Sequence, residues 1–356
     1  MKGGSTMQDH LKRAAAMIGS ARSLILTAHQ RPDGDAVGSL LGLAAALKDQ
    51  GRKVLCYTND PVKANFRFLP GADQVCHQLP EDLSDFDTAV ILDCHEPERI
   101  GPEGRRLVQS VPRLCVLDHH LGDGLCGTVE SECVQVIDTS ACATGAICLD
   151  LLELLGWAVT RDVAACLYTA VMTDTGGFAY SNTSARTFEI ARKLVEKGAD
   201  PYEISACVFE TRALSQLKML GEALAGLETF FDGRFSLMQV GPEMFRKWGC
   251  TEADTDEFVA YARSVDGVEV AALVKEFVPG RISVSLRSKF YVNVAALAAE
   301  FGGGGHFHAA GFKTKGSSEK VIEMLLDRVA SYLEAPSSTA DTPVSGRIRA
   351  AGQGIC

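Results

Sequence analysis

The sequence predicts an α/β protein with a parallel sheet in its first half and a smaller α+β domain in its second. Two observations carry this prediction. Over the first two hundred residues, short apolar or β-branched runs alternate with helical stretches, which indicates a parallel sheet with helices on both faces. From Phe230 onward the pattern changes to strands joined by turns such as Asp232-Gly233 and Pro279-Gly280, which is typical of an α+β domain.

In the first domain, the strands are the short apolar runs, and the helices are longer stretches that close at a glycine. Strands are expected at 23–28, 53–57, 88–92 and 114–117. Helices are expected at 36–50, 144–155, 162–173 and 184–197. Gly51, Gly156 and Gly198 directly follow three of these helices, in the position where glycine commonly ends a helix.

The second domain is reached through residues 201–227, which are expected to be helical. Beyond them the sequence predicts strands at 234–240, 268–277 and 281–287, and helices at 292–300 and 319–334. The predicted organisation is an extension at 1–9, a first domain at 10–200, the helical connection at 201–227, a second domain at 228–334 and a tail at 335–356. The tail is predicted to be disordered because it is rich in Ser, Thr, Pro and Gly.

Composition restricts the classes of function. The chain has 356 residues, of which 46% are hydrophobic and 22% charged, enough to bury two cores. Its net charge of −10 argues against binding long duplex nucleic acid, because neutralising phosphates requires basic surface. No apolar run reaches the roughly 18 residues that span a bilayer, and the start lacks a signal-peptide core. We therefore expect a cytoplasmic protein without membrane contact.

The twelve cysteines form no C-x-x-C pair. Most lie inside apolar runs, so we expect them to be reduced and buried, as is usual in the cytosol. Their spacing does not support a zinc ribbon.

Four polar clusters follow strands or helices of the first domain. They are residues 29–35 (HQRPDGD), Asp93, residues 118–120 (DHH) and residues 174–177 (DTGG). The carboxyl ends of parallel strands form one edge, where ligands bind, so these clusters are expected to converge. Five carboxylates packed together repel one another unless cations lie between them, which predicts a metal site.

Each cluster by itself has an ordinary explanation as a turn, a helix cap or a solvated loop. Only their convergence at one edge favours metal. Oxygen ligands with some imidazole and no thiolate indicate Mn²⁺ or Mg²⁺ rather than structural zinc. Asp33 and Asp35 flank Gly34 and can face different ions, and Asp93 can bridge two ions about 3.5–4 Å apart.

Taken in order, the motifs resemble those of the DHH phosphoesterase superfamily. The resemblance rests on HQRPDGDAVGS at 29–39, Asp93, DHH at 118–120, DTGGFAYSNT at 174–183 and FGGGGHFHAAG at 301–311. The last of these is similar to the glycine-rich motif of the DHH-associated C-terminal domain. Five motifs in the right order make the resemblance specific, and it covers about residues 10–334. The most similar branch is that of the bacterial nanoRNases that also act on 3′-phosphoadenosine 5′-phosphate (pAp).

The resemblance implies a Rossmann-like catalytic domain that binds two Mn²⁺ ions, for which Mg²⁺ or Co²⁺ are candidate substitutes. The implied ligands are His29, Asp33 and Asp93 for one ion, and Asp35, Asp93, His119 and Asp174 for the other. His120 would act on the phosphoryl group or the leaving oxygen. Asp118 would orient the histidines.

The resemblance also implies that the second domain binds substrate and that the active site lies in a cleft between the domains. The implied substrate-binding residues are Arg287, Gly303, Gly304, Gly305 and His306. A flexible linker is the ordinary explanation of such a glycine run. Two segments depart from the family, Phe307-His308 and residues 288–293. In the latter, Phe290 and Tyr291 are candidates for stacking on a base or for packing under the glycine loop.

The implied function is hydrolysis of short oligoribonucleotides to 5′-mononucleotides and of pAp to AMP, by water activated between two metals. One alternative within the superfamily is a cyclic or linear dinucleotide phosphodiesterase. An alternative of another class is a non-catalytic nucleotide-binding regulator. The intact set of site residues favours an enzyme. Short RNA and pAp are the expected partners, and a homodimer is left open.

Overall fold

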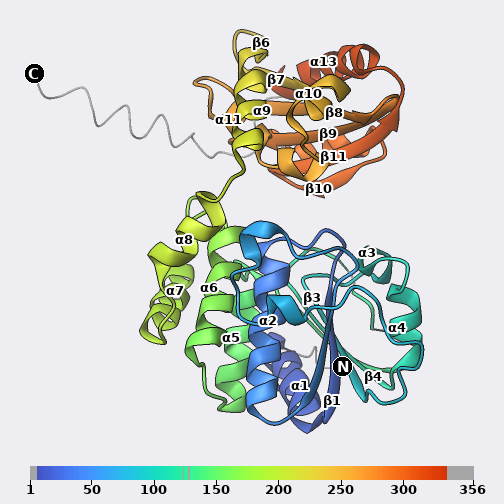
Figure 1. The fold of residues 1–356 in the computed structure, drawn as a ribbon, viewed down its shortest axis with the longest axis vertical. Helices are drawn as coiled ribbons and strands as arrows, with labels where there is room; N and C mark the ends of the chain where they lie inside the picture. The colour runs from blue at the N-terminus through green and yellow to red at the C-terminus, as the bar shows by residue number, and fades with distance from the viewer. Residues whose placement is uncertain (1–5, 123, 127–128, 335–356) are drawn as a thin grey trace, which may run out of the picture. The chain divides into compact units, whose positions relative to one another are not determined.

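The computed structural model describes residues 6–122, 124–126 and 129–334, apart from the side chain of His306. The chain forms two compact units, Met1–Thr211 and Arg212–Cys356 (Figure 1). The predicted tail at 335–356 and residues 1–5 of the predicted extension lie outside the described residues. Residues 7–9 of that extension are helical, because α1 (Met7–Ser20) begins there with Thr6 as its N-cap.

The first unit is built on a five-stranded sheet in which all strands are parallel, in the order β2-β1-β3-β4-β5. The strands are β1 (Ser23–Ala28), β2 (Lys53–Tyr57), β3 (Thr88–Leu92), β4 (Arg113–Asp118) and β5 (Glu132–Ile137). The predicted parallel sheet is thus confirmed. The sequence did not predict β5, because this edge strand buries only alternate residues and is interrupted by polar side chains.

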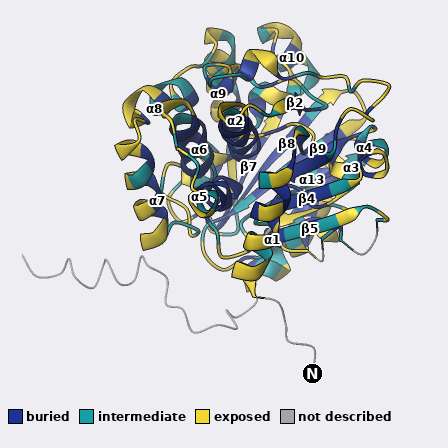
Figure 2. Cartoon of the chain, turned by 90° about the horizontal axis from the view of Figure 1, so that it is seen from below, coloured by how far each residue is buried: buried dark blue, intermediate teal, exposed yellow. Residues whose placement is uncertain are grey.

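Helices cover both faces of this sheet, as predicted. Leu24 and Leu26 of β1 face a core shared with α1, α2 (Gly34–Asp49), α5 (Thr144–Leu155) and α6 (Arg161–Asp174). Ile25 faces the opposite core, shared with α3 (Pro97–Ile100) and α4 (Gly104–Ser110). Figure 2 shows the buried inner faces of α2, α5 and α6 and their exposed ends. Since both faces are buried, the strands read as continuous apolar runs.

The segment 201–227, predicted to be helical, consists of two helices separated by a short break. After α7 (Ala185–Glu196), the chain forms α8 (Pro201–Phe209) in the first unit and α9 (Leu214–Ala225) in the second. In this break Arg212 donates to Tyr261 at 2.7 Å and pairs with Glu257, and all three residues belong to the second unit. In the described ranges, no helix combines the length and apolarity needed to cross a bilayer.

The second unit contains a six-stranded mixed sheet in the order β10-β11-β9-β8-β7-β6, which confirms the predicted α+β architecture. Only β7 and β8 pair in parallel. The strands are β6 (Glu228–Phe230), β7 (Phe235–Val240), β8 (Val270–Val278), β9 (Arg281–Ser288), β10 (Gly304–His306) and β11 (Ala309–Lys315). The helices are α10 (Pro242–Trp248), α11 (Phe258–Ser264), α12 (Val294–Ala299) and α13 (Ser318–Glu334).

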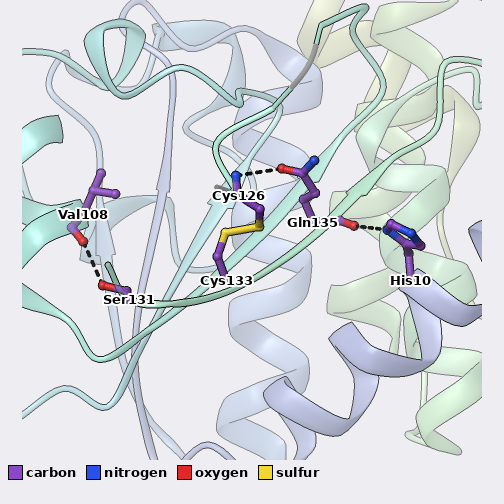
Figure 3. The surroundings of a disulfide bond; sticks show 6 residues. All are labelled: His10, Val108, Cys126, Ser131, Cys133 and Gln135. Carbon is purple, nitrogen blue, oxygen red and sulfur yellow. Dashed lines mark hydrogen bonds between the residues drawn. A yellow bond between two sulfur atoms is a disulfide. The ribbon is translucent and has the colours of Figure 1, made fainter. Parts of the chain in front are cut away.

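The expectation that all cysteines are reduced is contradicted at one pair. Cys126 and Cys133 form a disulfide between the loop before β5 and β5 itself, with Cα atoms 5.3 Å apart (Figure 3). The backbone N–H of Cys126 donates to the side-chain oxygen of Gln135 at 3.0 Å, which holds the loop against the strand. The two cysteines are seven positions apart in sequence, so no short Cys motif signals the pair. Nine further cysteines among the described residues are free thiols.

Candidate active site

The predicted polar clusters converge at the carboxyl edge of the first unit's sheet. The last residues of β1 and β3 and the penultimate residue of β4 are paired across the sheet. The residues that follow them, His29, Asp93 and Asp118, therefore lie side by side at this edge of the sheet. The strand order reverses between β1 and β3, which is where open α/β sheets bind ligands.

The first group of side chains consists of His29, Asp33 and Asp93. Nε2 of His29 lies 3.3 Å from Oδ2 of Asp93 and 3.9 Å from Oδ1 of Asp33. Nδ1 of His29 donates to the carbonyl oxygen of Gln30 at 2.7 Å, which leaves Nε2 facing the two carboxylates. Asp33 also caps α2, because its Oδ1 accepts from the N–H of Ala36. The carboxylate of Asp33 therefore both caps α2 and faces His29 in the polar cluster.

The second group surrounds His119. Its Nε2 lies 3.7 Å from Oδ2 of Asp35, 3.6 Å from Oδ1 of Asp93 and 3.7 Å from Oδ2 of Asp174. This nitrogen is buried and has no hydrogen-bond partner among the described residues. Three carboxylate oxygens thus surround it at distances too long for hydrogen bonds.

Asp93 belongs to both groups. Its Oδ2 faces His29 and its Oδ1 faces His119, and the residue is buried. Its backbone adopts the left-handed region with φ of 58°, which few non-glycine residues adopt and which costs energy. This conformation follows directly after β3 and sets the position of a carboxylate that lies between the two groups.

Asp35 is held at the N-terminus of α5. Its carboxylate accepts from the backbone N–H of Thr144 at 2.7 Å and of Gly145 at 2.9 Å, and from the hydroxyl of Ser39 at 2.9 Å. These N–H groups belong to the first turn of the helix, where they lack partners within the helix and favour a negative charge. The hydroxyl of Thr144 also donates to Asp93 at 3.1 Å. Sequence reasoning gave Thr144 only as a helix start.

Asp174, the last residue of α6, is held by Asn182. The amide of Asn182 donates to Oδ2 of Asp174 at 3.0 Å and to the carbonyl oxygens of Asp174 and Cys142. Asn182 stands in the DTGGFAYSNT motif, but its role in orienting the carboxylate becomes visible only in the folded chain.

Asp118 is fully buried and accepts hydrogen bonds from two imidazoles. Its Oδ1 accepts from the backbone N–H of His120 at 3.1 Å and from Nδ1 of His120 at 2.7 Å. Its Oδ2 accepts from Nδ1 of His95 at 2.5 Å. Nδ1 of His120 also lies 3.5 Å from Oδ1 of Asp93. Sequence reasoning missed His95, although its place two residues after Asp93 is a signal that could have found it.

The carboxylates of the site differ in charge preference. Burial, followed by repulsion from the other carboxylates, raises the pKa of Asp93 well above the ordinary value. Burial and Asp35 raise the pKa of Asp174 to about 7. Asp118 behaves in the opposite way: burial would raise its pKa, but the hydrogen bonds and charge of His120 outweigh burial and hold the pKa well below the ordinary value. The surroundings of Asp118 therefore favour its anionic form, whereas those of Asp93 and Asp174 favour the protonated form in the absence of a cation.

The residues fit divalent cations. Three groups have ligand atoms within 4.8 Å of one another and can hold a metal ion: His29, Asp33 and Asp93; Asp35, His119 and Asp174; and Asp93, His119 and His120. The crowded carboxylates and the unpaired nitrogen of His119 both become favourable when a cation is shared between them. Donors of this kind, with no thiolate, suit Mn²⁺ or Mg²⁺.

In the second unit, the predicted substrate-binding residues lie on neighbouring strands. Arg287 of β9 pairs with Ala309 of β11, which pairs with His306 of β10. The side chain of His306 lies outside the described part of the structure. The glycine run is not a linker, because its last residues form β10. A Cβ at Gly303 would lie 2.2 Å from a carbonyl oxygen of β11, and one at Gly305 would lie 2.5 Å from another, so this hairpin requires glycine.

Comparison with known proteins connects these features to named relatives. The model of the DHH family, N-terminal domain, matches residues 23–171, and that of the DHHA1 domain matches residues 237–335. A bifunctional oligoribonuclease and PAP phosphatase NrnA from Thermus thermophilus is 31% identical over 318 residues, covering 87% of this chain and 92% of the relative. The protein of the same name from Bacillus subtilis is 25% identical over 296 residues, covering 81% and 88%.

One solved structure resembles most of the chain. The crystal structure of an exopolyphosphatase-related protein from Bacteroides fragilis superposes with a TM-score of 0.82 at 26% identity. The match covers 91% of this chain and 96% of that one.

Proposed function

The chain belongs to the DHH family and is a phosphoesterase, and from this premise we propose that it hydrolyses short oligoribonucleotides to 5′-mononucleotides and pAp to AMP. The observation that carries the proposal is the double cluster that Asp93 links, since its donor atoms suit two cations and thereby a phosphoryl group. The names of the relatives from Thermus thermophilus and Bacillus subtilis supply the substrate classes.

The proposed ligands are His29, Asp33 and Asp93 for one Mn²⁺ ion and Asp35, Asp93, His119 and Asp174 for the other, with Mg²⁺ or Co²⁺ as substitutes. When bound, such ions supply an acidified water for attack on phosphorus and stabilise charge on the phosphoryl oxygens. The chain itself orients these ligands through the hydrogen bonds of Thr144 and Asn182.

His120 is the proposed catalytic neighbour of the phosphate. Because its Nδ1 donates to Asp118, whose anionic form is favoured, the plane of the ring is set and Nδ1 keeps its proton. In the imidazolium form, in which both ring nitrogens carry protons, Nε2 would donate its proton to the phosphoryl or leaving oxygen while Nδ1 stays bonded to Asp118, which is acid catalysis by a positioned imidazole. Asp118 acts through His120 and does not need to touch the substrate.

In the second unit, Arg287, Gly303, Gly304, Gly305 and His306 are the proposed substrate-binding residues. A guanidinium on a strand can bind a phosphate through two parallel hydrogen bonds. A Cβ at Gly304 would meet open space, so its backbone is accessible. Phe290 and Tyr291 are 47% and 38% exposed, which favours a role in stacking on a base over packing under the glycine loop. A cytoplasmic location completes the proposal, because both proposed substrates are intracellular nucleotides.

The experiment is hydrolysis of pAp and of a ribonucleotide series from two to about ten residues, with Mn²⁺, by wild type and His120→Ala. We expect turnover of pAp and of the shortest oligomers, with 5′-mononucleotides as products, and its loss in the variant. The matched control is His10→Ala, because the imidazole of His10 lies on α1 and donates to the carbonyl oxygen of Gln135 in β5, outside the polar clusters of the site. Failure to hydrolyse either substrate class while Mn²⁺ is bound would contradict the proposal and favour cyclic dinucleotides or a binding role.

A further inference from the structure

We propose that His95 is a positioning residue that sets the orientation of His120 through the carboxylate they share. The inference rests on the proposed role of His120 but concerns a residue outside the family motifs described above. His95 follows Asp93 by two residues, in the segment that leaves β3, and its side chain is buried. It contacts the turn that carries both His119 and His120.

The first contact is with Asp118. The two carboxylate oxygens of Asp118 divide their roles, since Oδ2 accepts from His95 and Oδ1 accepts twice from His120. A carboxylate held by only one of its oxygens can rotate about its terminal bond, because that torsion is soft. The hydrogen bond from His95 removes this freedom, so Oδ1 stays in line with Nδ1 of His120.

The second contact is with Gly122, two residues beyond His120. A Cβ built on Gly122 would lie 2.1 Å from Nε2 of His95 and 2.7 Å from its Cε1. The backbone of the turn therefore passes directly over the edge of the imidazole, at a distance that only glycine allows. The ring of His95 is thus enclosed between Asp118 at the start of the turn and Gly122 at its end.

A role of His95 as a metal ligand is less favourable on this geometry. Its Nδ1 is used by Asp118 and its Nε2 faces the backbone of Gly122. None of the three groups of described residues that can hold a metal ion includes it. The structure therefore assigns His95 to the support of the catalytic histidine, and loss of such support typically costs 10- to 100-fold in activity.

The test compares His95→Ala, His95→Asn and the control His10→Ala. We expect kcat for pAp to fall about 10- to 100-fold in His95→Ala with KM changed less than about twofold, because substrate contacts are retained. His95→Asn should recover most of the loss, since the asparagine amide can donate from nearly the position of Nδ1. An unchanged kcat in folded His95→Ala, or an equal loss in both variants, overturns the proposal.

A second pair of variants separates positioning from mere folding. Gly122→Ala should lower kcat as His95→Ala does, because the new Cβ must displace the ring. In the His95→Ala background the same substitution should cost almost nothing, since no ring remains to be displaced. Additive losses in this double-mutant cycle contradict the proposal.

The readout that does not depend on turnover is the ¹⁵N-histidine NMR spectrum of the metal-free protein. Downfield imidazole N–H resonances are expected for both His95 and His120, and His95→Ala should shift or broaden that of His120 while His10→Ala leaves it unchanged. A His120 resonance unaffected by His95→Ala overturns the inference. If wild type hydrolyses neither pAp nor oligonucleotides, the proposed function fails, yet the spectrum still decides the role of His95.

Discussion

Thr144 donates its hydroxyl proton to Asp93 at 3.1 Å while its backbone N–H donates to Asp35 at 2.7 Å. One residue at the start of α5 thus orients two carboxylates from different elements, Asp35 in the first turn of α2 and Asp93 directly after β3. Thr144 lies 51 residues from Asp93 and 109 residues from Asp35 in sequence. The chain must therefore fold before Thr144 can contact either carboxylate.

Replacing Thr144 by valine should lower activity without unfolding the protein. Valine retains the shape and the backbone N–H, so only the bond to Asp93 is lost, and we expect kcat to fall about tenfold, or about 1.4 kcal/mol. Steady-state kinetics with Mn²⁺ measure this. Thr169→Val is the matched control, because the buried hydroxyl of Thr169 donates to the carbonyl of Ala165 in its own helix and not to a carboxylate of the site. Equal effects in both variants contradict the assigned role.

Asp93→Asn should abolish activity. The amide cannot serve as an anionic ligand to both groups, so we expect kcat to fall by a factor on the order of 10³ or more, together with weaker Mn²⁺ binding. Calorimetric titration and kinetics measure the two effects. Asp85→Asn is the control, since Asp85 is an exposed partner of Lys53 on the surface of the same unit. Retention of more than a tenth of wild-type activity would argue against a bridging carboxylate.

Mn²⁺ affinity should rise with pH up to about 7. Burial and Asp35 raise the pKa of Asp174 to about 7, so in the metal-free protein its carboxyl holds a proton below that pH. A cation must displace this proton, and the dissociation constant therefore falls as the pH rises from about 5 to about 7. Titration calorimetry over this range gives the profile.

The raised pKa of Asp174 should make the metal-free protein less stable as the pH rises, which is the opposite of its effect on Mn²⁺ affinity. The folded-state pKa of about 7 exceeds the ordinary value of 3.8, so the folded chain binds the proton more tightly. This contribution to the free energy of unfolding is complete below the ordinary value and is lost as the pH rises through about 7. Asp174→Asn should flatten the dependence of Tm on pH, and an unchanged slope would show that another group dominates.

Glu269 should control the order of the loop that carries Phe290 and Tyr291. Its buried carboxylate accepts from the backbone N–H groups of both residues and of Val292, at 2.8–3.2 Å. Glu269→Gln replaces one acceptor by a donor, so these amides should exchange hydrogen about tenfold faster or more, and KM for oligonucleotides should rise. Hydrogen exchange by mass spectrometry measures the first effect.

Glu276→Gln is the control for that experiment. Glu276 accepts from Gly280 and Ser318 at the opposite end of the β8–β9 hairpin, so exchange at 290–292 should stay at the wild-type rate. If Glu269→Gln also leaves this exchange unchanged, the carboxylate does not order the loop.

The Cys126–Cys133 disulfide should be detectable and modestly stabilising. Thiol titration of the denatured, non-reduced chain is expected to find ten of the twelve cysteines reactive, twelve less the two joined. Closing so short a loop contributes about 2–3 kcal/mol to the free energy of unfolding in the chain-entropy model, so Cys126→Ser should lower stability by that amount. Twelve reactive thiols would show that the pair is reduced in the isolated protein.

The sequence by itself determined the local features of this protein. Continuous apolar runs predict buried parallel strands, as at 88–92, because a strand covered on both faces needs no polar alternation. The candidate ligands could also be predicted from the sequence, since His29, Asp33 and Asp93 follow the ends of predicted strands. Strand order then follows general rules of α/β sheets, which place such ends at one edge.

Only the tertiary structure decided which side chains support those residues. His95 meets Asp118 across 23 residues of sequence, and Thr144 meets Asp35 across 109. The glycine run becomes strand β10 because it pairs with β11, and the helical segment 201–227 divides into two helices that belong to different units. The physical reason is common to all of these cases. Hydrogen bonds and close contacts between distant segments depend on strand register and helix packing. Neither the register nor the packing can be predicted from the local pattern of residues.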